Sequence, residues 1–362
     1  MLNYSSPTIK ELRVRVVRVP MKEPHLTASG SVTESPLILT DIVTDSGVVG
    51  RSIIFTYTPA ALKPTADLIA NLKPLIIGKA LAPIELEQEL RKRFRLLGVQ
   101  GLVAMALAAI DMALWDALAR THNVSLVRLL GGIEKPTQAY GAIGYDGVAG
   151  CAKSAEQWAK LGFRGVKAKI GYPTVAEDIA VIRAIRKAAG ESMAIMVDYN
   201  QSLSPVEAVR RLQSLDDEGC TWVEEPTLAH DYEGHAIVAR AAKTPIQTGE
   251  NWWGVLDMQH AITAGASDYV MPDVMKIGGV TGWQRAAALA AVKGFPVSSH
   301  LWPEISARLL CCTPTAHWLE YADWWNPILR EPLIIKDGYA HIGSEAGSGL
   351  DWDEDAVERF AA

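Results

Sequence analysis

The chain has 362 residues, of which 49% are hydrophobic and 21% charged, and its formal net charge is −6. This length and composition fit a globular protein with a large core and room for two domains. No basic run is present, so we expect neither nucleic acid nor a membrane as a partner. Four cysteines without a CxxC pair and residues 1–14 without an apolar signal core predict a reduced, cytoplasmic protein.

The first 135 residues mix strand and helix signals. Apolar and charged residues alternate over 12–19, and two further strands are predicted over 37–43 and 48–54. Helices are predicted over 60–75, 86–96 and 102–118. Asp111 and Asp116 interrupt the last of these, which favours a buried core helix over a membrane span. Residues 1–135 are therefore predicted to form an α+β domain.

From residue 137 onward, short apolar runs alternate with helical stretches. The eight runs cover residues 139–142, 165–169, 194–198, 221–224, 245–249, 268–271, 295–298 and 316–320. This alternation predicts an α/β fold with a (β/α)-type TIM-like barrel over residues 136–327. The remaining segment, 328–362, holds a strand-like stretch over 332–342, and we expect the segment to pack back on the first domain.

Seven of the eight runs carry or meet an ionisable residue at their carboxyl end. These residues are Lys169 (with Lys167), Asp198, Glu224, Glu250, Asp273, His300 and Glu320. Successive members are 20 to 29 residues apart, which is about the length of one βα unit. Because the strand ends of such a barrel meet at one mouth, we expect these side chains to share one active site.

Three acidic residues on consecutive strands, Asp198, Glu224 and Glu250, indicate a metal site. Three inward carboxylates would repel one another without a cation between them. An all-oxygen set favours Mg²⁺ over zinc, and the sequence has no HxxxH or HExxH spacing. Glu225 should face the opposite side of its strand and is not counted as a ligand.

The remaining ionisable residues suit proton transfer. Lys167 and Lys169 lie two apart, so both should point into the barrel, where their mutual repulsion would lower the pKa of one. His300 and Asp273, on neighbouring strands, could form a dyad in which Asp273 fixes the imidazole tautomer. A protonated Glu320 could donate a hydrogen bond to a substrate carboxylate.

Together these groups fit the removal of a proton next to a carboxylate. Loss of that proton leaves a doubly negative enediolate, which Mg²⁺, Lys167 and a protonated Glu320 would stabilise. Two bases on opposite faces, Lys169 and His300, would then remove and return the proton.

The same residues lie in motifs that resemble the mandelate racemase group of the enolase superfamily. The motifs are VKAKIGYP (166–173), MVDYNQSL (196–203), EEPTL (224–228), GENW (249–252), MKIGGVTGW (275–283) and SSHL (298–301). The resemblance runs over nearly the whole chain. It implies an N-terminal capping domain over a (β/α)₇β barrel, a substrate lid near residues 21–35, and a homo-oligomer, with an octamer as one form.

The resemblance also implies roles for individual residues. Asp198, Glu224 and Glu250 would bind Mg²⁺. Lys169 would be the base for the (S) face, the His300–Asp273 dyad the base for the (R) face, and Glu320 the acid. Asn200 and Lys167 would support them.

The expected substrate pocket departs from that pattern. Ala142 stands where the group's namesake enzyme has a serine, and Ser29 and Ser31 make the lid more polar. The further residues predicted to line the pocket are Phe55, Tyr57, Leu301 and Trp302.

We therefore expect an isomerase, a Mg²⁺-dependent racemase or epimerase that acts on a small 2-hydroxy carboxylate. Two alternatives remain open. The first is an acid-sugar dehydratase that uses the same metal and bases, which a polar lid would favour. The second is a catalytically inactive binding homologue, although a pure binding protein needs no paired bases.

Overall fold

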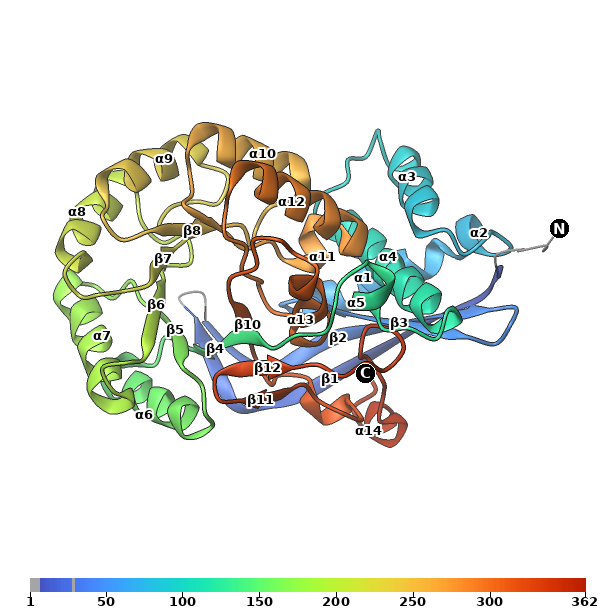
Figure 1. Ribbon diagram of the computed structural model, residues 1–362, viewed down its shortest axis with the longest axis horizontal. Helices are drawn as coiled ribbons and strands as arrows, with labels where there is room; N and C mark the ends of the chain where they lie inside the picture. Colours follow the sequence, from blue (N-terminus) through green and yellow to red (C-terminus); the bar gives the residue numbers. More distant parts are fainter. Residues whose placement is uncertain (1–6, 28–29) are drawn as a thin grey trace.

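The structure is a computed structural model that describes residues 7–27 and 30–362 (Figure 1). Its first part is a capping domain with an antiparallel sheet in the order β1 (Ile9–Thr27), β2 (Gly30–Thr44) and β3 (Val49–Phe55). The helices that follow are α1 (Pro59–Asn71), α2 (Lys73–Ile76), α3 (Pro83–Arg93), α4 (Gly101–Thr121) and α5 (Leu126–Leu129).

The predicted single helix over 60–75 is wrong, because α1 ends at Asn71 and α2 begins at Lys73. Pro74 has no backbone N–H to donate to the carbonyl of Ala70, four residues earlier, so the hydrogen-bond ladder of α1 does not continue through it.

Helix α4 lies at the centre of the capping domain. It is long and apolar enough to span a membrane, but 83% of its most apolar window is buried inside the protein, as expected for a core helix. β3 packs directly on it at Gly50, where an added Cβ atom would lie 2.2 Å from the carbonyl oxygen of Ala113. On another side of α4, the Asp111 carboxylate accepts a hydrogen bond from the backbone N–H of Thr281 at 3.0 Å, which joins the two domains.

The second domain is a TIM-like barrel. Its strands are β4 (Thr137–Ile143), β5 (Gly165–Lys169), β6 (Ala194–Asp198), β7 (Trp222–Glu224), β8 (Ile246–Thr248), β9 (Tyr269–Val270) and β10 (Leu319–Tyr321). The helices are α6 (Gly147–Lys160), α7 (Val175–Ala189), α8 (Pro205–Leu215), α9 (Tyr232–Ala241), α10 (Val255–Ala264), α11 (Val274–Ile277), α12 (Gly279–Lys293) and α13 (Pro303–Cys311), most of which surround the strands (Figure 1).

Neighbouring barrel strands from β4 to β9 pair in parallel, and β10 closes the ring by pairing with β4. The run predicted over 295–298 does not form a full strand. Val297 makes only isolated parallel bridges, to Val270 on one side and to Ala316 on the other. The eight predicted runs lie at the positions of the barrel strands, but the seventh run joins the ring through isolated bridges and not as a continuous strand.

The C-terminal segment contains η1 (Asn326–Ile328), β11 (Ile334–Lys336), β12 (Tyr339–His341) and α14 (Glu354–Arg359). The strand-like stretch does not pack on the capping domain as expected. It forms a hairpin whose β12 pairs with the start of β4. The later residues do reach the capping domain: the Trp352 indole donates to Asp41 at 2.9 Å, and Ala361 bridges to Val17.

The predicted lid, residues 21–35, is the hairpin between β1 and β2, in which His25 pairs with Val32 and Leu26 with Ser31. The backbone N–H of Tyr145, in the loop after β4, donates to the Leu26 carbonyl at 2.8 Å, so the hairpin reaches the barrel mouth. Ser31 is exposed, and Ser29 lies outside the described residues.

Candidate active site

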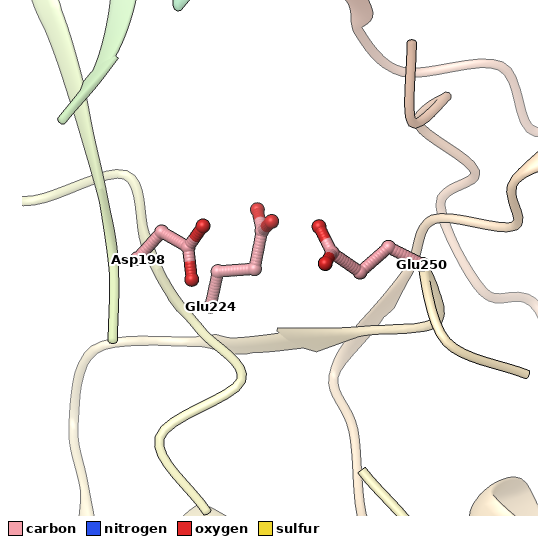
Figure 2. A group of neighbouring side chains, drawn as sticks. All are labelled: Asp198, Glu224 and Glu250. Carbon is pink, nitrogen blue, oxygen red and sulfur yellow. The ribbon is translucent and has the colours of Figure 1, made fainter. Parts of the chain in front are cut away.

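Three carboxylates meet at the mouth of the barrel. Asp198 ends β6, Glu224 ends β7, and Glu250 follows β8. One carboxylate oxygen of each lies within 4.8 Å of the others, and Figure 2 shows Asp198 and Glu250 on either side of Glu224. Mg²⁺ binds oxygen at about 2.0–2.1 Å, so ligands on opposite sides of one ion lie about 4 Å apart. The limit of 4.8 Å exceeds this span by less than 1 Å, so small side-chain movements would let the three carboxylates share a single Mg²⁺ ion.

The electrostatics of this cluster favour a cation. Burial raises the pKa of Glu224 well above its ordinary value, and the neighbouring charges of Asp198 and Glu250 raise it further, against the lowering effect of Lys167. A divalent cation among the three oxygens would offset both the repulsion and the loss of hydration.

The two lysines on β5 contact different ends of this cluster. The Lys167 Nζ lies 2.5 Å from Glu224 and 2.9 Å from Glu320. The Lys169 Nζ lies 3.0 Å from Asp198 and 2.6 Å from the side-chain oxygen of Asn200. Asn200 thus supports Lys169 directly.

The expectation that mutual repulsion lowers the pKa of one lysine is wrong for the protein by itself. Burial does lower the pKa of Lys169, and Lys167 adds to this, but the carboxylates of Asp198 and Glu250 outweigh both and raise it. A bound Mg²⁺ would neutralise these carboxylates and so act in the opposite direction.

His300 and Asp273 form the expected dyad. His300 Nδ1 lies 2.7 Å from Asp273 Oδ2, so the imidazole Nε2 points away from Asp273 and lies 3.2 Å from Glu250 Oε2. Burial lowers the pKa of His300, but Glu250 and the hydrogen bond with Asp273 raise it above its ordinary value.

Glu320 lies on β10 beside Lys167 and accepts a hydrogen bond from the backbone N–H of Leu301 at 3.0 Å. The charges around Glu320 in the protein by itself act against the expected protonated form. Burial raises its pKa, but the charges of Lys167 and His300 lower it below its ordinary value.

The predicted pocket residues separate into two groups. Ala142 lies beside Lys167 in the register of β4 and β5, and Tyr57 reaches the dyad, with its hydroxyl 3.4 Å from Asp273. Phe55, Leu301 and Trp302 are only 2%, 2% and 1% exposed, so the prediction that they line an open pocket is wrong. The Trp302 indole N–H donates to Asp273 at 2.9 Å, so this residue lies behind the dyad and is not an open pocket wall.

A row of rings lies between the capping domain and the barrel. Phe55 lies 4.8 Å from Tyr57 and 5.7 Å from Trp324 between ring centroids, and Trp324 lies 4.8 Å from the ring of His25. Burial, with the nearby charges of Lys169 and Lys167, lowers the pKa of His25 to about 3, which indicates a neutral ring. We did not predict His25 or Trp324 from the sequence, since no motif marks them.

Lys276 was also missed. Its Nζ donates to the Asn251 side-chain oxygen at 2.7 Å and lies 4.8 Å from the centre of the Tyr57 ring. The Asn251 amide in turn donates to Glu225 at 2.7 Å and to Glu250 at 3.1 Å. Glu225 thus lies outside the metal cluster, as expected, but it does not face away from the mouth, because Asn251 connects it to Glu250 and so helps to orient that carboxylate. The position of Lys276, one helical turn after Asp273, could have suggested its proximity.

Comparisons with known proteins identify the family of this chain. Residues 9–131 match the family model described as mandelate racemase/muconate lactonizing enzyme, N-terminal domain, and residues 150–356 match the model described as enolase C-terminal domain-like. The L-talarate/galactarate dehydratase of Salmonella typhimurium is 34% identical over 72% of this chain and 66% of that protein. Other relatives are cycloisomerases and epimerases.

Solved structures of similar chains contain magnesium. An enolase from Bradyrhizobium complexed with magnesium and mandelic acid is 43% identical, with a TM-score of 0.95 over 99% of both chains. An L-talarate dehydratase from Polaromonas complexed with Mg and L-glucarate is 28% identical, with a TM-score of 0.92 over 99% of this chain and 98% of that one. The chain therefore belongs to the mandelate racemase/muconate lactonizing enzyme family, the Mg²⁺-dependent enzymes of the enolase superfamily.

Proposed function

We propose that this protein is a racemase or epimerase that moves the proton next to the carboxylate of a 2-hydroxy acid. The observation that carries the proposal is the position of two proton-transfer groups at opposite ends of the metal cluster. Lys169 contacts Asp198, and His300 contacts Glu250, while these two carboxylates lie on either side of Glu224. A substrate bound over the cluster would thus have one base at each face.

The residues of this chain would then act as follows. A bound Mg²⁺ would polarise the substrate carboxylate and so make the neighbouring proton more acidic. Lys167, between Glu224 and Glu320, would hold positive charge beside the oxygens on which negative charge develops. Lys169 would transfer the proton on one face, and His300 Nε2 would transfer it on the other, because Nδ1 is engaged by Asp273.

The row of rings supports a substrate with a flat, apolar substituent. Tyr57, Trp324 and His25 offer ring faces and a neutral imidazole, and the buried Phe55 packs against Tyr57 and Trp324. Such a surface suits an aromatic group better than a chain of hydroxyls, which would need several hydrogen-bond partners. The similar Bradyrhizobium enolase was crystallised with mandelic acid, a 2-hydroxy acid with a phenyl ring.

An acid-sugar dehydratase is the second candidate. The Salmonella relative and the Polaromonas structure carry names of this activity. In this reaction the same proton is removed, and His300 would assist the departure of a 3-hydroxyl group in place of returning the proton.

One experiment separates the candidates. The Mg²⁺-loaded protein is incubated in D₂O with (R)- and (S)-2-hydroxy-2-arylacetates and with a panel of sugar acids, and the α-proton is followed by NMR. Deuterium exchange with inversion of an arylacetate supports the racemase, and a 2-keto-3-deoxy product supports the dehydratase. Absence of exchange and product with every acid would contradict both.

Variants test the assignment of the two bases. Lys169→Ala should abolish exchange for one enantiomer and His300→Asn for the other, since each base serves one face. His235→Asn is the control, because His235 is also buried but bonds to Thr227, away from the cluster. Full two-way turnover in both Lys169→Ala and His300→Asn would show that the base assignment is wrong.

A further inference from the structure

The dyad aspartate receives hydrogen bonds on both oxygens. Asp273 Oδ1 accepts from the backbone N–H groups of Met275 and Lys276 at 2.7 and 3.1 Å, which caps α11. Asp273 Oδ2 accepts from His300 Nδ1 at 2.7 Å and from the Trp302 indole N–H at 2.9 Å, and the Tyr57 hydroxyl lies farther from the same oxygen, at 3.4 Å. Asp273 is fully buried, so water cannot replace a missing donor there.

We propose that Trp302 is a positioning residue for the second base, which acts by holding Asp273 in the orientation that His300 requires. This inference rests on the proposed function and adds a residue to it. The indole N–H can only donate and carries no charge, so it fixes the carboxylate without competing for the imidazole proton.

The backbone at this point is unusual. Leu301 and Trp302, which directly follow His300, both have left-handed backbone, with φ of 47° and 55°. Non-glycine residues rarely adopt this conformation and do so where their surroundings hold them, often at functional sites. Glu320 accepts from the Leu301 N–H at 3.0 Å, and Pro303 begins α13 directly after Trp302. This turn directs the indole N–H of Trp302 toward the Asp273 carboxylate.

A second tryptophan lies beside the first. The rings of Trp302 and Trp325 stack with centroids 5.3 Å apart at 24°, and the Trp325 indole donates to Glu304 at 3.0 Å. Both indoles are almost fully buried. Trp325 is therefore a matched control: it has the same ring, burial and kind of hydrogen bond, but no contact with the dyad.

The test compares Trp302→Phe with Trp325→Phe in the D₂O exchange experiment. Trp302→Phe keeps an aromatic ring and removes the N–H donor. It should slow exchange on the His300 face by about tenfold or more, because a hydrogen bond to a buried charged group is lost. The rate of exchange on the Lys169 face should stay within about twofold of that of the unaltered protein. In Trp325→Phe, the rates on both faces should stay within the same range.

Equal slowing of both faces, or of neither, in Trp302→Phe would overturn the proposal, as would a face-selective loss in Trp325→Phe. Absence of exchange in the unaltered protein would instead contradict the proposed function. A second measurement does not depend on activity. In proton NMR, the hydrogen bond to Asp273 should shift the indole N–H resonance of Trp302 away from the position of a free indole. Asp273→Asn should move that resonance; if no indole resonance moves, the contact with Asp273 is refuted whatever the activity.

Discussion

We predict that the carboxylate of Asp111 links the stability of this protein to pH. Asp111 lies on α4 of the capping domain and accepts hydrogen bonds from the N–H and hydroxyl of Thr281, in the first turn of α12. Burial raises its pKa from 3.8 to about 7, against the lowering effect of the two Thr281 hydrogen bonds, and Glu87 raises it further.

The sign and size of the effect follow from this pKa. In the unfolded chain Asp111 ionises near its ordinary value, whereas in the folded protein it keeps its proton to about pH 7. Its stabilising contribution is therefore complete below about pH 4 and is lost as the pH rises through 7. Each pH unit between the two pKa values lowers the free energy of unfolding by about 1.4 kcal/mol. The total loss is about 4 kcal/mol, of which about 3 kcal/mol falls between pH 5 and 8.

Asp111→Asn should remove this dependence, because the amide is neutral at both pH values. Urea unfolding, followed by tryptophan fluorescence, gives the free energy of unfolding of both proteins at pH 5 and 8. The free energy of unfolding of the variant minus that of the unaltered protein is free of the effects of the other titrating groups, which both proteins share. Between pH 5 and pH 8 this difference should change by about 3 kcal/mol in favour of the variant. Parallel pH profiles for the two proteins would refute the reasoning.

Two further changes test the metal cluster and the packing of the capping domain. Glu250→Gln should weaken Mg²⁺ binding by about tenfold or more in calorimetric titration, because one of the three anionic ligands becomes neutral; an unchanged affinity would exclude Glu250 from the site. Gly50→Ala should lower the melting temperature, because its Cβ would lie 2.2 Å from the Ala113 carbonyl oxygen and force β3 away from α4. Overpacking of this kind costs about 1–3 kcal/mol, and a melting temperature equal to that of the unaltered protein would contradict the close contact.

Much of the fold could be predicted from local patterns. The short apolar runs and the spacing of Lys169, Asp198, Glu224 and Glu250 predict a barrel, because each βα unit takes a similar length of chain. The break between α1 and α2 at Leu72 was missed, since the apolar period continues across it and a proline does not always end a helix: Pro64 lies inside α1.

The sequence by itself determined which residue types reach the barrel mouth. Side chains alternate along a strand, and the ends of parallel strands converge, so the three carboxylates and two lysines could be placed together before any coordinates. His300 and Lys169, the two proposed bases, could be placed at the mouth in the same way.

Only the tertiary structure decided the protonation and the surroundings of these groups. The charge of Glu320 depends on Lys167 and His300, which come from other strands. The contacts of Trp302, Lys276 and His25 depend on a left-handed turn, on helix α11 and on a hairpin from another domain. Such effects arise between segments far apart in the chain, and they depend on distances and burial that no local pattern encodes.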